Sequence, residues 1–223
     1  FKDWKVQRRE PNPKSGALEI VALLEGDVAV PISMTRGKEL FDITGLRVTY
    51  FTDPKTAGEK SLEVRLRSDK ARVDNERDRV DLAGRVRVER DEGNGAMTVI
   101  EAPEAVLHFR KRFVCPAHEP RQPQAGKCPA CGAELKPRTF TTIEAPRTFE
   151  MTKSYPATHM TGEGLTASDD VRTMRVERDG FLVTAGSPKE LAAPAPSAVP
   201  SKPALTEMRS KGPMTFVETE AGI

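Results

Sequence analysis

All three cysteines of the chain lie within seventeen positions, and one of its three histidines lies among them. The four side chains are Cys115, His118, Cys128 and Cys131, in the pattern C-x2-H, nine residues, C-x2-C. Zinc binds thiolate sulfur and imidazole nitrogen tetrahedrally, and a Cys3His set completes its coordination shell. The spacing therefore predicts one structural zinc ion. Its binding would supply folding free energy to a segment that is too small to have a core of its own.

Two other interpretations of these residues remain open from the sequence. One pair of cysteines can form a disulfide and leave the third thiol over, or all three can stay reduced. A catalytic zinc requires an open coordination position and a nearby general base. Glu119 and Glu134 are close in sequence, but neither has a recognisable partner for such chemistry. We therefore expect a structural rather than a catalytic metal.

The cysteine-rich segment resembles the small heavy-metal-binding domain of bacterial copper and silver efflux adaptors and copper-transporting ATPases. The shared residues are Cys-Pro-x-His at 115–118 and Gly-x-Cys-Pro-x-Cys-Gly-x-x-Leu at 126–135. That family has methionine where this chain has Ala117 and Ala133. Thioether ligands favour Cu(I), so their absence favours structural zinc over copper transfer.

The rest of the chain must position this segment, and its pattern is that of β-structure. Apolar and polar residues alternate with a period of two over 62–67 and 80–89, and no helical period is sustained. Gly84 interrupts the second run and predicts a bend or bulge. We predict an all-β fold, an antiparallel β-jellyroll or sandwich, with the zinc ribbon inserted as a small hairpin.

Several short motifs recur along the chain. Leu-Ala-Gly-Arg-Val-Arg-Val at 82–88 is echoed by Leu-Glu-Gly-Asp-Val-Ala-Val at 24–30, and Ile-Glu-Ala-Pro occurs at both 100–103 and 143–146. These motifs and Met-Thr-Gly-Glu-Gly-Leu-Thr-Ala at 160–167 resemble the periplasmic β-jellyroll domains of lipopolysaccharide transport, the LptC and OstA-like group. The resemblance implies a domain that holds acyl chains between its sheets and aligns edge to edge with neighbouring jellyrolls.

The predicted organisation follows from these motifs and from composition. We expect an extended lead-in at 1–17, the jellyroll at 18–186 and the inserted ribbon at 113–137. Residues 187–204 are rich in Pro, Ala and Ser and read as a linker, and 205–223 as the start of a second β unit. The chain begins at Phe1 rather than Met, and we expect it to be a processed or trimmed fragment. An inner-membrane anchor would then lie outside it.

Composition restricts the function further. The net charge is only +2, so nothing in it points to nucleic acid, and no run of about eighteen apolar residues suggests a membrane span. His108 and His159 stand alone on predicted strands, and no phosphate-binding loop or catalytic constellation is present in the sequence. We expect a non-enzymatic periplasmic component that transports or bridges lipid, with lipopolysaccharide and neighbouring jellyrolls as partners. The alternative is a periplasmic zinc- or copper-binding protein or metallochaperone.

The side chains of the alternating apolar face are the candidate lipid-contacting residues. The same alternation is typical of an ordinary sandwich core, so both interpretations stay open from the pattern alone. The candidates are Val64, Leu66, Val73, Val80, Leu82, Val86, Val88 and Ile100.

Overall fold

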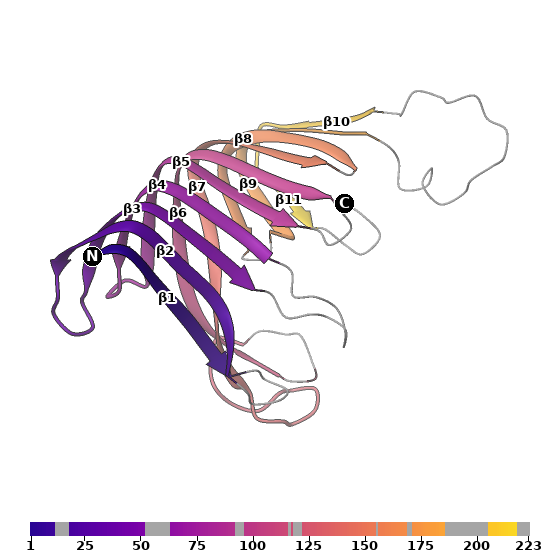
Figure 1. Cartoon of the computed structure of the whole chain (residues 1–223). Coiled ribbons are helices and arrows are strands. Elements are labelled where there is room, and N and C mark those ends of the chain that lie inside the picture. Colours follow the sequence, from indigo (N-terminus) through magenta and orange to yellow (C-terminus); the bar gives the residue numbers. More distant parts are fainter. Residues whose placement is uncertain are drawn as a thin grey trace.

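The computed structural model describes residues 1–11, 18–51, 63–91, 96–115, 117, 122–154, 156–168, 171–185 and 205–217. Within these ranges the secondary structure is β and contains no helix, and all eleven strands belong to one antiparallel sheet, which confirms the predicted all-β class (Figure 1). Accordingly, no helix able to cross a membrane occurs in the described part of the chain. The strands are β1 (Lys2–Pro11), β2 (Leu18–Ser33), β3 (Leu40–Phe51), β4 (Glu63–Asp74), β5 (Arg79–Asp91), β6 (Met97–Val114), β7 (Lys136–Ser154), β8 (Ala157–Ser168), β9 (Thr173–Ala185), β10 (Leu205–Ser210) and β11 (Met214–Val217).

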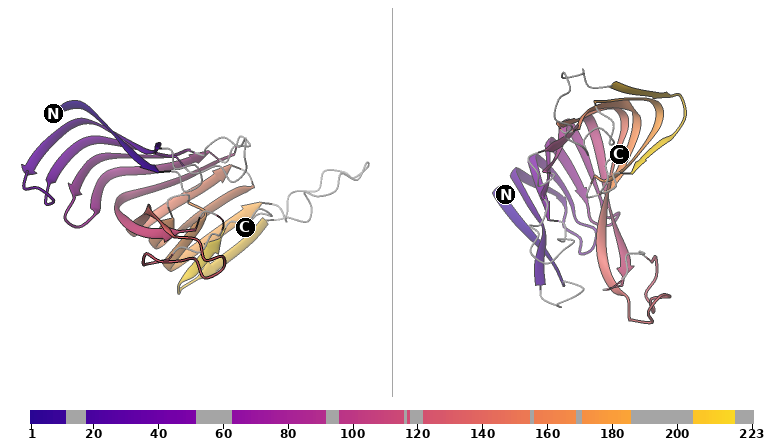
Figure 2. Two further views of the ribbon diagram at one scale, coloured as in Figure 1. Left: turned by 90° about the horizontal axis from the view of Figure 1, so that it is seen from below. Right: turned by 90° about the vertical axis from the view of Figure 1, so that its right-hand side faces the viewer.

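The sheet is a meander in which each strand pairs with the next along the chain. The order runs from β1 to β10, and β11 pairs with the other half of β9. The long strands bend near their middles, so that the sheet folds over on itself (Figures 1 and 2). A jellyroll-like shape therefore arises from bent strands of one sheet rather than from two separate sheets.

A line of β-bulges produces this bend. Pairing shifts register between Arg67 and Lys70, between Ala83 and Val86, and at corresponding places in the pairs from β6 to β9. Gly84 has a φ of +69°, and a Cβ there would lie 3.0 Å from Asp69 Oδ2. A bulge adds a residue, bends the strand and increases its twist. The bend that the sequence predicted at Gly84 is thus confirmed.

Side chains on the inner face form rows that cross the sheet. In one half of the fold, cross-strand partners follow one another through ten strands, and in the other half through nine. All but the outermost members of these rows are buried or half-buried, and most belong to one core cluster. The first row is Val6, Leu24, Val48, Leu66, Val88, Ile100, Met151, Met160, Leu182 and Met208. The second is Pro31, Phe41, Val73, Val80, Leu107, Ile143, Ala167, Met174 and Phe216.

The sheet extends beyond the expected jellyroll bounds at both ends. Residues 2–11, expected as an extended lead-in, form β1 and pair with β2. Residues 205–217, expected as the start of a second unit, instead pair with β9 and complete the same sheet. The sequence does not indicate that β1 belongs to the sheet, because this strand carries charged residues on both faces. The predicted linker at 187–204 lies outside the described residues.

Candidate functional site

The cysteine-rich ribbon lies at the end of the hairpin formed by β6 and β7. These two strands continue past their neighbours, because the last pair between β5 and β6 is Arg79 with His108, and the last between β7 and β8 is Thr142 with Ser168. Beyond these pairs, residues 109–114 and 136–141 form a two-stranded projection that we call the arm. Residues 115–135 join its two strands, and that they form a zinc ribbon stays a prediction.

Backbone hydrogen bonds link the described residues of the ribbon. Phe113 and Gln122 exchange N–H···O bonds of 2.9 Å in both directions. The N–H of Gly132 donates to the carbonyl oxygen of Cys128 at 2.8 Å, and a further 2.8 Å bond runs from the N–H of Cys128 to the carbonyl oxygen of Ala133. The N–H of Leu135 donates to the carbonyl oxygen of Gly126. These hydrogen bonds bring Cys115 close to Cys128 and Cys131.

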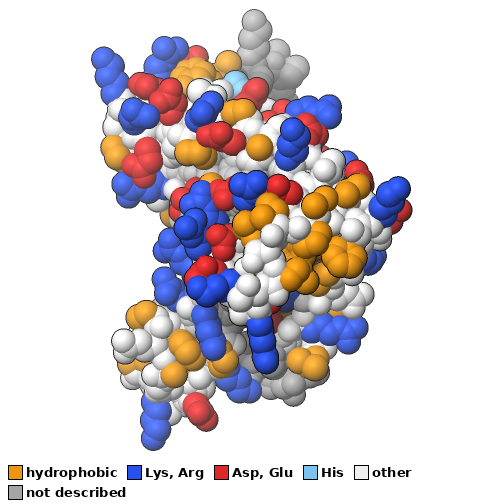
Figure 3. Space-filling view, turned by 90° about the vertical axis from the view of Figure 1, so that its left-hand side faces the viewer, with side chains coloured by type: hydrophobic (Ala, Val, Ile, Leu, Met, Phe, Trp, Pro, Cys, Tyr) orange, Lys and Arg blue, Asp and Glu red, His pale blue; other side chains and the backbone are white. Residues whose placement is uncertain are grey.

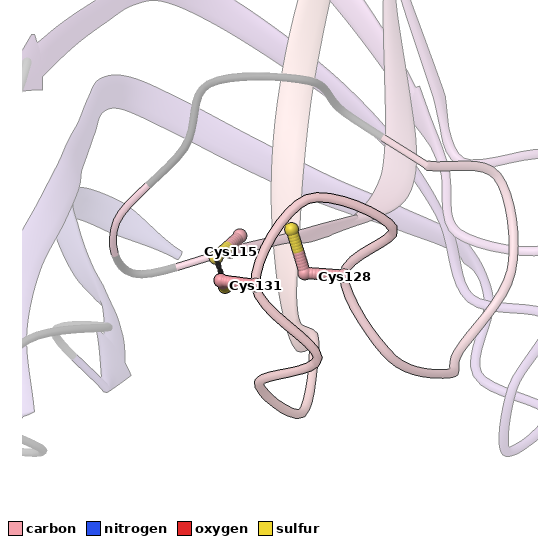
Figure 4. A group of neighbouring side chains, drawn as sticks. All are labelled: Cys115, Cys128 and Cys131. Carbon is pink, nitrogen blue, oxygen red and sulfur yellow. Dashed lines mark hydrogen bonds between the residues drawn. The ribbon is translucent and has the colours of Figure 1, made fainter.

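The three sulfur atoms converge in the ribbon (Figure 4). The Sγ atoms of Cys115, Cys128 and Cys131 all lie within 4.8 Å of one another, and those of Cys115 and Cys131 are 3.5 Å apart. A tetrahedral zinc with Zn–S bonds of about 2.3 Å requires sulfurs roughly 3.8 Å apart. The three thiols are free rather than joined in a disulfide. This arrangement fits three ligands of one ion.

A small apolar cluster of its own surrounds the sulfurs. Cys115, Cys128 and Leu135 are buried and pack with the half-buried ring of Phe113, whereas Cys131 is exposed. The pKa of the Cys131 thiol is raised: the backbone N–H of Ala133 lowers it, but hydrogen bonds with the Cys115 and Cys128 sulfurs and partial desolvation outweigh this effect. A bound cation would favour the thiolate forms of the sulfurs that coordinate it.

The fourth predicted ligand, His118, lies outside the described residues, so its place relative to the sulfurs stays a prediction. Cys115 itself accepts a hydrogen bond from the backbone N–H of Ala117 at 3.4 Å. Such N–H···S contacts are typical of thiolates in metal knuckles, because they offset negative charge on the sulfur. The three described sulfurs therefore suit zinc, and the fourth ligand that a structural site requires stays a prediction.

The arm is fixed to the first strand of the sheet. The backbone N–H of Thr139 donates to Glu10 Oε2 at 3.3 Å, and the guanidinium of Arg8 lies 5.6 Å from the ring centre of Phe109. Arg8 and Glu10 also form an ion pair of 3.1 Å. Thr139 lies beyond the end of β8, so Glu10 accepts from an edge N–H that no neighbouring strand pairs. One edge strand thereby positions the arm and its ribbon.

The eight candidate lipid-contacting residues all face the interior of the folded sheet. Seven are buried, and the eighth, Val73, is half-buried against the same core cluster. Val64 and Leu66 have no exposed surface. These side chains pack against one another, as in a sandwich core, so contact with an acyl chain requires that the two halves separate or that the chain enters from an open edge.

The two sheet edges are where the interior becomes accessible. The first row ends at Val6 on β1, which is 51% exposed, and at Met208 on β10, which is 48% exposed. Other large apolar side chains on the first two strands are also exposed, and Figure 3 shows hydrophobic side chains gathered on the face that the N-terminal strands occupy in Figure 1. The apolar interior therefore continues to both edges.

The outer face of the body is polar and carries paired charges. Arg87 contacts Glu89 at 2.7 Å and Glu101 at 2.5 Å, and hydrogen bonds with Glu89 and then Glu101 raise its pKa. The two isolated histidines belong to this face: His108 pairs with Glu144 at 3.3 Å and His159 with Glu150 at 2.9 Å.

Comparison with known proteins finds a similarity for less than half of this chain. Residues 28–116 match the sequence model of the family described as "Lipopolysaccharide-assembly, LptC-related". The match begins within β2 and ends as the cysteine-rich ribbon begins, so it includes the motifs at 82–88 and 100–103, whereas those at 143–146 and 160–167 lie outside it. No curated protein and no solved structure matches the chain significantly. The stretch from β2 to β6 is thus LptC-like, as the motifs predicted.

Sequence reasoning missed the residues at the ends of the inner rows. Val6 lies in a charged strand, Lys-Asp-Trp-Lys-Val-Gln-Arg-Arg, and Met208 follows a Pro/Ala-rich stretch. Only the pairing of Val6 with Leu24 and of Met208 with Leu182 reveals that both belong to the apolar row. Period-two alternation at Trp4, Val6 and Arg8 was the only available signal, and Arg8 breaks it.

Proposed function

We propose that this chain is a non-catalytic component of lipopolysaccharide or lipid transport, acting in the periplasm as a bridge between membranes. The main support for this proposal is the first inner row of side chains. The row is apolar from Val6 to Met208, and these two end residues are half-exposed. The match of residues 28–116 to the LptC-related family supports the same function.

In this proposal the open edges join the interior to that of neighbouring jellyrolls. An edge strand offers unpaired N–H and C=O groups, on which the strand of another protein can add. Such pairing would place a neighbour's apolar row in line with Val6 or Met208. A lipid chain could then pass between proteins without leaving an apolar surface, since burying its methylenes gains about 0.8 kcal/mol each.

We further propose that Cys115, His118, Cys128 and Cys131 bind one zinc ion with a structural role. The closeness of three sulfurs and the backbone hydrogen bonds that bring them together support this assignment. When bound, zinc would crosslink the ribbon and hold the end of the arm. The described residues supply three ligands, and in a Cys3His set no position remains for a reacting water.

The second candidate function, periplasmic heavy-metal binding or delivery, rests on the ribbon alone. The exposure of Cys131 favours it, because an accessible thiol permits ligand exchange with a partner. The alanines at 117 and 133 disfavour copper delivery, since they replace the thioethers that Cu(I) prefers. A delivery protein would release its ion readily, whereas a structural site would hold it as long as the ribbon is folded.

Native mass spectrometry of the full chain, purified from a lipopolysaccharide-producing cell, separates the two functions. Lipid transport predicts a folded protein that carries one zinc ion and co-purifies with lipid. Metal delivery predicts a metal that exchanges within minutes with a competing chelator and a folded protein without lipid. Finding neither lipid nor a stable zinc ion would refute the proposed function.

A further inference from the structure

The positive charge of this chain is concentrated in the arm and its ribbon. Residues 109–140 contain seven Lys or Arg and two Asp or Glu, a net charge of +5. The whole chain has a net charge of only +2, so the remaining residues together carry −3. A small basic projection therefore extends from an acidic body.

Pairing places four of the five basic side chains of the arm on one face, and Lys111 lies on the other, over the ring of Phe113. Because side chains alternate between faces along a strand, Arg110 and Arg112 lie on the face opposite Phe109, whose ring contacts Arg8 of the body. Across the arm, Arg112 pairs with Arg138, Arg110 with Phe140, and Val114 with Lys136. We call this set the basic face: Arg110, Arg112, Val114, Lys136, Arg138 and Phe140.

Two arginines of the basic face, Arg110 and Arg112, differ from those of the body in their ion pairs. On the body, arginines of the outer face form ion pairs: Arg65 with Glu63, Arg72 with Asp42, and Arg175 with Glu177, at 2.7–2.8 Å. Within the described residues, Arg110 and Arg112 form no ion pair. Like charges directly opposite each other, such as Arg112 and Arg138, destabilise an antiparallel pair. An external anion would therefore find two arginines, Arg110 and Arg112, that form no ion pair within the described residues.

We propose that the basic face docks on the phosphate groups of an anionic lipid bilayer. A bilayer surface fits better than a discrete acidic protein, because this face is a narrow two-stranded ribbon that has arginines alongside Phe140 and Val114. Basic residues attract anionic headgroups, and aromatic residues insert at the headgroup level. The contacts of β1 with Phe109 and Thr139 hold the opposite side of the arm and leave this face outward. The proposal is independent of any lipid inside the sheet.

Vesicle co-sedimentation of the full chain tests this docking. Vesicles of phosphatidylcholine with about one third phosphatidylglycerol are compared with pure phosphatidylcholine, at low and physiological salt. The double variant Arg110→Thr, Arg112→Thr removes two charges and keeps strand propensity. It should lower binding to the anionic vesicles at least about tenfold, because each surface charge contributes about 1 kcal/mol, roughly fivefold. Salt should weaken the wild-type binding.

The matched control is Arg65→Thr, Arg72→Thr, which makes the same change on the body and should bind within about twofold of wild type. Equal losses in both variants would attribute binding to net charge alone and overturn the proposal. Failure of the wild-type protein to bind anionic vesicles would also overturn the proposal and would indicate an acidic protein as the partner. Circular dichroism and zinc content show whether the arm variant is folded.

A second readout does not depend on the arginines. Phe140→Trp in a Trp4→Phe background places the only tryptophan on the basic face. Brominated anionic lipids should quench its fluorescence, whereas the native Trp4, packed against Gly26, should be protected. Vesicle binding without quenching at position 140 would overturn the assignment of the basic face.

Discussion

Val6 and Met208 lie at opposite ends of one row of inward-facing side chains, although 202 positions separate them in sequence. Each neighbour in the row is a direct cross-strand partner of the next, so the row crosses ten strands without interruption. Both end residues are half-exposed, whereas the members from Val48 to Leu182 are buried. An apolar path thus leads from one open edge of the sheet to the other.

The bend of the sheet depends on glycine at position 84. Gly84→Ala introduces a side chain at φ +69° and 3.0 Å from Asp69 Oδ2, so it should lower the free energy of unfolding by about 1–2 kcal/mol. Chemical denaturation measures the change. Gly212→Ala is the control, because a Cβ there meets nothing within 4 Å, and it should change stability by less than about 0.5 kcal/mol. Equal effects would show that the bulge does not need a glycine.

Loss of the metal should unfold the ribbon and leave the sheet folded. Cys128→Ser removes a buried thiolate, and we expect zinc to fall from one equivalent to much less than half, with loss of amide protection in 113–137. The sheet should stay folded, because the ribbon cluster is separate from the main core. Elemental analysis and hydrogen exchange measure both effects. Ala130→Ser, in the same turn, should keep the metal; a wild-type protein without metal would refute the site.

The ribbon should be removable without unfolding the sheet. Arg112 and Arg138 are direct partners, so replacing 113–137 by Asn-Gly closes the hairpin with a two-residue turn. We expect a far-ultraviolet spectrum and a melting temperature close to those of the full chain. A collapse of the melting temperature would instead show that the ribbon belongs to the core. Replacement by Pro-Pro, which cannot form that turn, is the destabilised comparison.

The sequence predicts the class of fold because its signal is local. Alternation at 62–67 and 80–89 places Val64, Leu66, Val86 and Val88 on one face, and the structure has them there. The bulge at Gly84 is also local, since it needs only a residue that tolerates positive φ. The sequence also predicts that Cys115, Cys128 and Cys131 converge, because few residues separate them.

What the sequence does not predict are the relationships that depend on distant pairing. The strand β1 has no apolar face of its own beyond Trp4 and Val6, and its place is decided by hydrogen bonds to β2. Residues 205–217 follow a long Pro/Ala-rich stretch, yet they pair with β9 rather than starting a new unit. The contact between Glu10 and Thr139 links positions 129 residues apart, and no local pattern indicates it.

Site-specific photo-crosslinking in lipopolysaccharide-producing cells tests the central claim most directly. A photoreactive residue at Val6 faces the inner row at the open edge, whereas one at the adjacent Lys5 lies on the opposite face of the same strand. We predict lipopolysaccharide adducts at position 6 and not at position 5, with the row members Leu24 and Met208 behaving like Val6. Folded protein that gives no lipid adduct at Val6, Leu24 or Met208, or equal adducts at Lys5, would contradict lipid transport along the interior of this sheet.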